Sequence, residues 1–174
     1  MTHDASPLPP DDALTLRVKG FATSQQFTRM FQDGMAMVEE TAAYLDGPGR
    51  EESKTLPRRA ALTYAGESMR LTTRLMQVAS WLLVQRAVRE GDMSVAEAAK
   101  EKYRLGAREI CKGRKAEAEE MLPARLVDLL RRSEHLYERV DRLDGAVYRG
   151  ESDTSGNGAL AHLGRLQAEF GASE

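Results

Sequence analysis

Residues 57–90 read PRRAALTYAGESMRLTTRLMQVASWLLVQRAVRE, and this stretch decides the fold class of the chain. No proline interrupts it after Pro57, a residue that fits the first turn of a helix because its missing N–H would be unpaired there in any case. Apolar residues recur at steps of three and four, which predicts a helix of about 33 residues and ~50 Å. The second half, from Arg74 to Val88, is apolar around much of its circumference, so we expect it to be covered on more than one side.

Two further long helices are predicted around this one. Ser24 fits an N-cap, and apolar residues follow it at helical spacing as far as Leu45. DGPG at 46–49 ends that helix, and REESKT at 50–55 is predicted to be a charged loop. Pro123 begins the last long helix. Its apolar positions alternate in steps of three and four and form a heptad seam of Leu126, Leu129, Ser133, Leu136, Val140, Leu143 and Val147.

Three long helices joined by turns pack most simply as an antiparallel three-helix bundle, so the predicted fold class is all-α. Ser94 and Glu97 form a capping box, which predicts a short helix as far as Leu105 that covers part of the longest helix. A second copy of the chain can cover the rest of its apolar surface, which predicts a homodimer. No strand-like alternation occurs in the sequence.

The domain prediction follows from where the helical pattern starts and stops. Residues 1–19 are predicted to be a flexible N-terminal lead-in, since the first twelve contain three prolines and few large apolar groups. Residues 20–149 are predicted to form the bundle domain. Residues 150–174 are predicted to be a flexible C-terminal tail that contains a short amphipathic segment.

Composition limits the classes of protein to which the chain can belong. The 174 residues suffice for one ordinary domain, and 41% of them are hydrophobic, enough to bury a core. Aromatic residues make up only 6%, which is low for a β-sandwich or barrel. Acidic and basic residues are mixed and give a net charge of −2, which disfavours a dedicated nucleic-acid or membrane-surface protein.

Cysteine usage and the start of the chain predict its cellular compartment. Cys111 is the single cysteine, so no intramolecular disulfide can form, which fits a reducing environment. The first twelve residues, MTHDASPLPPDD, lack the basic and then apolar order of a signal peptide. The longest apolar run is about seven residues, far short of the ~20 that a membrane-spanning helix needs. We therefore expect a soluble cytoplasmic protein without a membrane partner.

The sequence offers no arrangement of residues that predicts catalysis. His3, His135 and His162 are scattered, and no histidine or cysteine pair has metal-ligand spacing. The nucleophile elbow, the phosphate-binding loop, the dinucleotide fingerprint and the Glu-x-x-His pairs of di-iron bundles do not occur. A packed thiol is the favoured interpretation of Cys111. We therefore predict no catalytic residue, no metal and no cofactor. The alternative hypothesis is an enzyme or cofactor carrier built in the bundle.

The C-terminal stretch, GESDTSGNGALAHLGRLQAEFGASE at 150–174, contains the first candidate partner-binding residues. Small polar residues open it, and they are followed at helical spacing by Leu160, Leu163, Leu166 and Phe170. An isolated segment of about three turns is too short to be a stable helix in water. It can fold on a groove of a partner through anchors spaced by three and four residues. The alternatives are that it docks back on its own bundle or has no role.

A basic run at 100–115 contains the second set of candidate partner-binding residues, Lys112, Arg114 and Lys115. One interpretation is a surface for an acidic face of a partner protein. The alternative is a small DNA-binding regulator in which 94–115 forms a helix-turn-helix. The internal Gly113 and the net negative charge of the chain disfavour nucleic acid. Methionine is frequent, with eight residues, and core filling is favoured over a docking surface for those on the first two long helices.

Two segments, ESMRLTTRLMQVASWLLVQRAV at 67–88 and EKYRLG at 101–106, resemble the RcdA family of alphaproteobacteria, the regulators of CtrA degradation. The resemblance covers roughly residues 60–106. It implies a dimeric three-helix bundle that acts as a non-catalytic adaptor for the ClpXP protease. The resemblance assigns no docking motif to particular residues, so the candidate residues named above are inferred from the sequence of this chain alone.

The resemblance also implies particular partners. The response regulator CpdR primes the ClpX unfoldase, and the RcdA-type protein then docks and carries cargo. The transcription factor CtrA is delivered through a further cyclic-di-GMP-binding adaptor, PopA, whereas other cargo binds directly. The C-terminal segment of the family is implicated in partner engagement. A cytoplasmic location with recruitment to a cell pole belongs to the same expectation.

Overall fold

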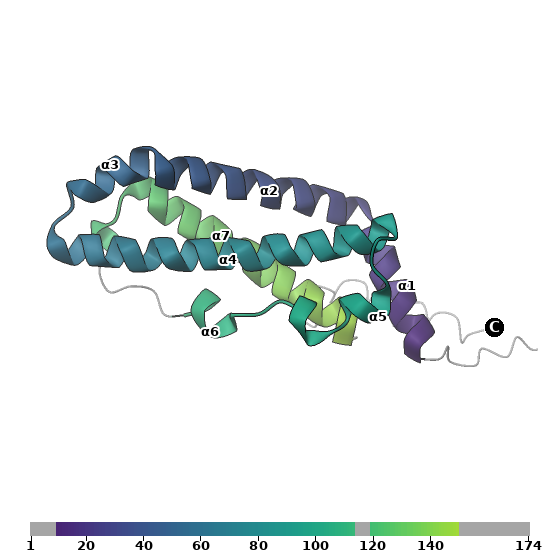
Figure 1. Ribbon diagram of the computed structural model, residues 1–174. Coiled ribbons are helices and arrows are strands. Elements are labelled where there is room, and N and C mark those ends of the chain that lie inside the picture. Colours follow the sequence, from purple (N-terminus) through teal and green to yellow (C-terminus); the bar gives the residue numbers. More distant parts are fainter. Residues whose placement is uncertain (1–9, 114–118, 150–174) are drawn as a thin grey trace, which may run out of the picture.

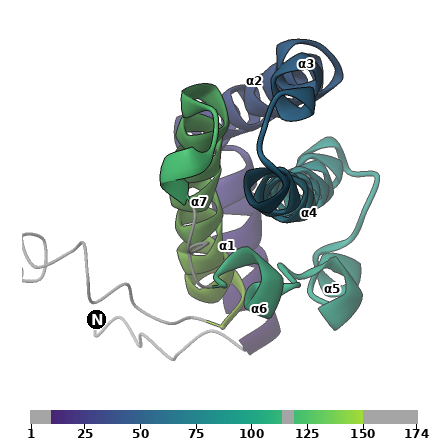
Figure 2. The ribbon, with the colours of Figure 1, turned by 90° about the vertical axis from the view of Figure 1, so that its left-hand side faces the viewer.

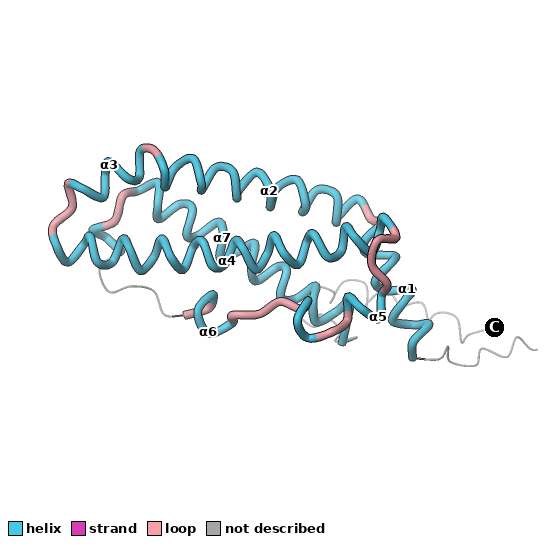
Figure 3. Tube along the Cα trace, viewed as in Figure 1, coloured by secondary structure: helices cyan, strands magenta, loops and turns pink. Residues whose placement is uncertain are grey.

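The computed structural model describes residues 10–113 and 119–149, and no strand occurs in these ranges (Figure 1). Helices account for nearly all of them and are joined by short loops (Figure 3). The predicted all-α fold class is therefore confirmed. No helix in the described ranges combines the length and the apolar character that crossing a membrane requires.

Three long helices, α2 (Gln25–Asp46), α4 (Arg58–Glu90) and α7 (Ala124–Asp144), lie side by side in an elongated bundle (Figure 1). Their starting points agree with the sequence signals. The Ser24 hydroxyl oxygen accepts a hydrogen bond from the Phe27 N–H at 3.1 Å, which caps α2. A proline directly precedes α4 and α7, where its fixed φ suits entry into a helix.

The direction of α7 differs from that of a simple up-and-down bundle. Arg74 donates a hydrogen bond to the Leu130 carbonyl at 3.1 Å, and Trp81, further along α4, donates to Asp144 Oδ1 at 2.9 Å. The two helices therefore run parallel, whereas α2 runs antiparallel to both (Figure 1). In the antiparallel three-helix bundle that the sequence predicts, an up-and-down chain would make the first and last long helices the parallel pair, whereas here the parallel pair is α4 and α7. The chain between α4 and α7 leads back along the bundle before α7 begins, so α7 starts at the same end as α4.

Helix α1 (Pro10–Ala22) occupies much of the segment that was predicted to be a flexible lead-in. It crosses one end of the bundle (Figure 2). Val18 and Ala22 are fully buried, and the Phe21 ring lies 5.7 Å from the Trp81 ring. The lead-in prediction is therefore wrong from residue 10 onward. The prolines at its start suggested a disordered segment. The helix gains most of its stability from the packing of its apolar residues on the bundle rather than from helix propensity.

Helix α3 (Pro48–Lys54) replaces the charged loop that was expected after α2. Pro48 stands at its first position, which suits a helix start. A Cβ atom on Gly49 would lie 2.7 Å from the Tyr64 hydroxyl and 2.8 Å from the Tyr44 ring, so only glycine allows this close approach. The loop prediction is wrong because the turn residues mark a corner between two helices and not the end of helical structure.

The connection from α4 to α7 is built from short pieces: α5 (Val95–Ala98), η1 (Glu101–Tyr103), α6 (Arg108–Cys111) and η2 (Glu119–Met121). Ser94 caps α5 by accepting a hydrogen bond from the Glu97 N–H at 3.1 Å, as predicted. The helix stops at Ala98 and does not reach Leu105, so the predicted capping helix is shorter than expected. Figure 2 shows α6 lying beside α4 and α7.

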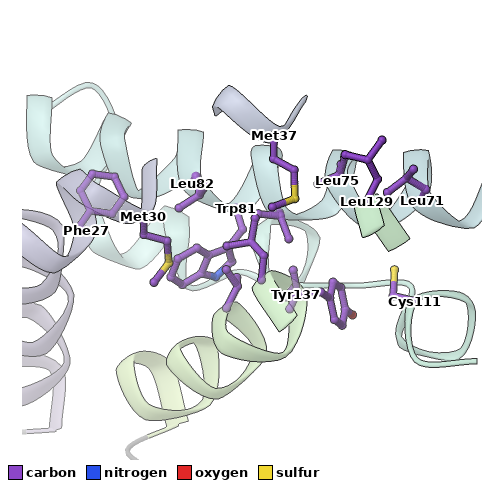
Figure 4. Packing of buried hydrophobic residues seen from close by; sticks show 14 of the residues in the cluster. Phe27, Met30, Met37, Leu71, Leu75, Trp81, Leu82, Cys111, Leu129 and Tyr137 are labelled. Carbon is purple, nitrogen blue, oxygen red and sulfur yellow. The ribbon is translucent and has the colours of Figure 1, made fainter. Parts of the chain in front are cut away.

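The core fills the space between α2, α4 and α7 (Figure 4). Its largest fully buried side chains include Trp81, Tyr44, Tyr137, Phe27, Met30, Leu71 and Leu82. The heptad seam of α7 is buried at six of its seven positions and half-buried at Leu143, which confirms the seam. It continues through a π-helical turn, η3 (Gly145–Arg149).

Candidate docking surfaces

A row of exposed apolar side chains follows the outer face of α4. Leu62, Met69, Met76 and Leu83 stand exactly seven residues apart and are 69%, 71%, 64% and 51% exposed. An apolar seven-residue repeat is the pattern by which one helix packs along another. Contiguous exposed apolar surface on a helix marks an interaction site. We call these four residues the α4 stripe.

An apolar groove of about 160 Å³ lies between α2 and α4 and borders the α4 stripe at Met76. Its lining consists of Val38, Thr41, Ala42, Leu45, Thr72, Leu75, Met76 and Ala79. Thr41 is 4% exposed, and its hydroxyl makes no hydrogen bond within the described residues. A buried hydroxyl without a partner costs about 1–3 kcal/mol. We call this site the α2–α4 groove.

The methionines divide between the core and this surface. Met30 and Met37 are buried in the core, so the core-filling interpretation is confirmed for them. It is wrong for Met69 and Met76, which project from the bundle. The sequence pattern could not separate the two cases, because α4 is apolar on more than one side and the period alone does not tell which side is covered.

Two acidic residues of α7 neutralise part of the basic run. Lys112 Nζ lies 2.6 Å from Asp141 Oδ2, and an Arg108 guanidinium nitrogen lies 2.9 Å from Asp141 Oδ1. Burial acts to raise the pKa of Asp141, but the two cations outweigh it and hold that pKa below its ordinary value. Arg104 makes a bidentate pair with Asp144 at 2.7 Å for each bond.

The remaining predicted partner-binding residues lie outside the described residues. These are Arg114 and Lys115 of the basic run and the tail residues Leu160, Leu163, Leu166 and Phe170. Of the predicted set, the structure therefore places only Lys112, whose ammonium is half exposed and paired with Asp141. The pairing had no local sequence signal, since its partner lies 29 residues further along the chain.

The helix-turn-helix interpretation gains no support from this geometry. The element in the position of a recognition helix, α6, has four residues. A recognition helix needs several exposed side chains along one face to reach base edges in a major groove. The cations of Arg108 and Lys112 are engaged by Asp141, which lowers the positive potential available to phosphates.

The titratable groups of the described ranges do not converge on a reactive centre. No cluster of three or more histidine, cysteine, aspartate or glutamate residues suited to a metal occurs there. Cys111 is fully buried, and burial raises the pKa of its thiol, which keeps it protonated at neutral pH. His135 is exposed on α7. The surfaces that stand out are apolar and lie on α2 and α4.

Comparisons with known proteins identify relatives of this chain. The profile of a family described as a protein of unknown function, DUF1465, matches residues 18–170. The crystal structure of RcdA from Caulobacter crescentus CB15 is 58% identical in sequence, with a TM-score of 0.63. The match covers 77% of this chain and 99% of that chain. No curated protein matches. The chain therefore belongs to the DUF1465 family and is a close homologue of Caulobacter RcdA, as its residues 67–88 and 101–106 predicted.

Proposed function

We propose that this protein is a non-catalytic adaptor that links cargo proteins to a ClpXP-type unfoldase–protease for regulated degradation. The observation that carries the proposal is the 58% identity to RcdA over 99% of that chain, because RcdA takes its name from the regulation of CtrA degradation. An adaptor needs docking surfaces rather than reactive groups, and the exposed apolar face of α2 and α4 is of that kind.

The partners proposed here follow the family expectation. ClpX primed by CpdR is the protease-side partner, and cargo binds directly or through the cyclic-di-GMP-binding adaptor PopA. The tail residues Leu160, Leu163, Leu166 and Phe170 and the basic residues Lys112, Arg114 and Lys115 are proposed to contact these partners. Recruitment to a cell pole would follow from binding a protease complex that is itself localised there. A reconstituted degradation reaction tests the proposal, with the cargo lifetime as its readout.

A second copy of the chain is proposed to cover the α4 stripe. The seven-residue spacing from Leu62 to Leu83 spans 21 residues of helix, or about 31 Å, which is long enough for a helix-to-helix interface. Burial of a large apolar side chain is worth about 1.5–3 kcal/mol, so four on each copy favour association. The stripe would then be self-complementary across a two-fold axis.

Charged residues in the stripe should separate the two copies. The double substitution Leu62→Glu and Met69→Glu is expected to shift the protein to monomers, since it places two carboxylates of each copy in an apolar interface. Sedimentation equilibrium at micromolar concentration measures the shift. Arg139→Glu on α7 is the matched control, because it changes the net charge by the same two units at an exposed site away from the stripe. Equal masses for the double variant and the unchanged chain would contradict the proposed interface.

A further inference from the structure

The part of the apolar surface of α2 and α4 that contains the α2–α4 groove matches in length an apolar segment in the tail of the same chain. The α2–α4 groove and the adjoining stripe run on α4 from Thr72 to Leu83, about 16 Å of helix. In the tail, Leu160 to Phe170 would span about 15 Å if helical. The profile of the family extends to residue 170 and so includes all four apolar residues of the tail.

We propose that residues 159–170 of the same chain dock as a short helix in the α2–α4 groove when neither a partner protein nor a second copy of the chain covers it. The regulatory effect of this docking rests on the proposed adaptor function, whereas the docking itself does not. At 100° per residue, Leu160, Leu163, Leu166 and Phe170 share one face of such a helix. The groove is the described apolar surface whose walls, two antiparallel helices, suit a helix laid between them.

One polar group in the tail segment and one in the groove would make the docking specific. Gln167 falls within the apolar face of the tail segment, between Leu163 and Phe170 on the helix surface. Thr41 lines the groove, and its unpartnered hydroxyl, which is buried, would reach the groove surface by rotation of the side chain about χ1. A glutamine amide both donates and accepts, so it can satisfy that hydroxyl. The pairing would remove the cost that the bare groove carries.

The connecting residues are long enough for docking within one chain. The end of α7 is fixed beside Trp81, whose indole N–H donates to Asp144 at 2.9 Å. Trp81 follows Ala79, at the end of the groove, by two residues on α4 and faces the core, so the path from the end of α7 to the groove leads around α4. Residues 150–159 can extend to ~36 Å, and a coil of that length spans roughly 16–19 Å on average. Half the circumference of a helix about 10–12 Å across is ~16–19 Å, which the extended length exceeds and the average coil length matches.

Docking of the tail would control the adaptor. The groove would shield the apolar residues that otherwise engage a partner, and a partner would have to displace them. Folding of a short segment costs part of its binding free energy, so the docked state exchanges readily. Weakening the groove should therefore strengthen partner binding through the tail, whereas weakening the tail should reduce it. These opposite effects on partner binding distinguish a tail that docks in the groove from a tail that only binds a partner.

Cross-linking in the full chain tests the proposal without protease or cargo, so its failure leaves the adaptor function untouched. Cysteines at Ala42→Cys, exposed at the groove, and Leu163→Cys are joined with a short bismaleimide at low protein concentration. The native Cys111 is buried and stays unreactive. Glu138→Cys with Leu163→Cys is the control, since residue 138 is exposed on α7 and no further from the start of the tail.

The groove pair is expected to cross-link within one chain at least about tenfold faster than the control pair. Thr41→Val should slow the groove reaction by about three- to tenfold, and adding Gln167→Leu should restore it, because the pair of polar groups is then removed together. Equal rates for the groove and control pairs would overturn the proposal. A covalent dimer from Ala42→Cys alone would overturn it as well, since a second copy would then occupy the groove.

Discussion

Replacing Asp144 with alanine is expected to lower the free energy of unfolding by about 3–5 kcal/mol. Asp144 is 1% exposed and accepts hydrogen bonds from Trp81 at 2.9 Å and from two guanidinium nitrogens of Arg104 at 2.7 Å. Removing the carboxylate leaves a largely buried cation and a buried indole N–H without their partner. The loss would also release the connection between α4 and α7, which Arg104 ties to the end of α7.

A guanidinium chloride titration followed by circular dichroism measures this change. Asp141→Ala is the matched control, because it removes the same group one turn earlier on the same helix. Asp141 pairs with the half-exposed side chains of Lys112 and Arg108, and pairs of that kind contribute about 0–1 kcal/mol. Equal destabilisation by the two substitutions would show that the Asp144 cluster does not hold the connection in place.

Truncation after Arg149 is expected to slow cargo delivery by at least about tenfold, which corresponds to ~1.4 kcal/mol of lost partner binding. The truncation removes all four apolar residues of the tail and leaves α1 to η3 complete. The melting transition should therefore shift by no more than about 2–4 °C, since the docked tail exchanges readily and contributes little stability. The measurement is the initial rate of cargo degradation in a reconstituted reaction at subsaturating adaptor concentration.

Point substitutions in the full chain separate the apolar residues from the length of the tail. Leu163→Ser with Phe170→Ser should reproduce most of the loss, since each removes a large apolar anchor from the same helical face. Ala161→Ser is the control, because residue 161 would lie on the opposite face of the segment. Full delivery by the chain truncated after Arg149 would remove the tail from the mechanism.

The long helices could be predicted from the sequence because their apolar periods are strong and their ends have caps and prolines. Helix α1 could not, since its few apolar residues are stabilised by Trp81 and the bundle end rather than by local preference. The parallel direction of α7 depends on the route of the chain between α4 and α7. That route is built from three- and four-residue pieces held by tertiary contacts such as the hydrogen bond from Tyr137 to the Gly106 carbonyl at 2.7 Å.

The candidate surfaces could likewise be predicted only in part. A basic run is visible in a sequence, but its neutralisation by Asp141 and Asp144 is not, because these acids lie 29 to 40 residues away along the chain. The α4 stripe has a clear seven-residue period. The period does not reveal that the opposite side of α4 already fills the core, so Met69 and Met76 were expected to be buried.

The most direct test of the proposed adaptor function is the dependence of cargo degradation on the concentration of this protein. The reaction contains the unfoldase–protease, CpdR, cargo and ATP. A molecule that links two partners through separate surfaces should accelerate degradation to a maximum and then inhibit it in excess, as cargo and protease become occupied by different adaptor molecules. We predict this rise and fall. No acceleration at any concentration, or acceleration of degradation that requires no binding to cargo, would contradict it.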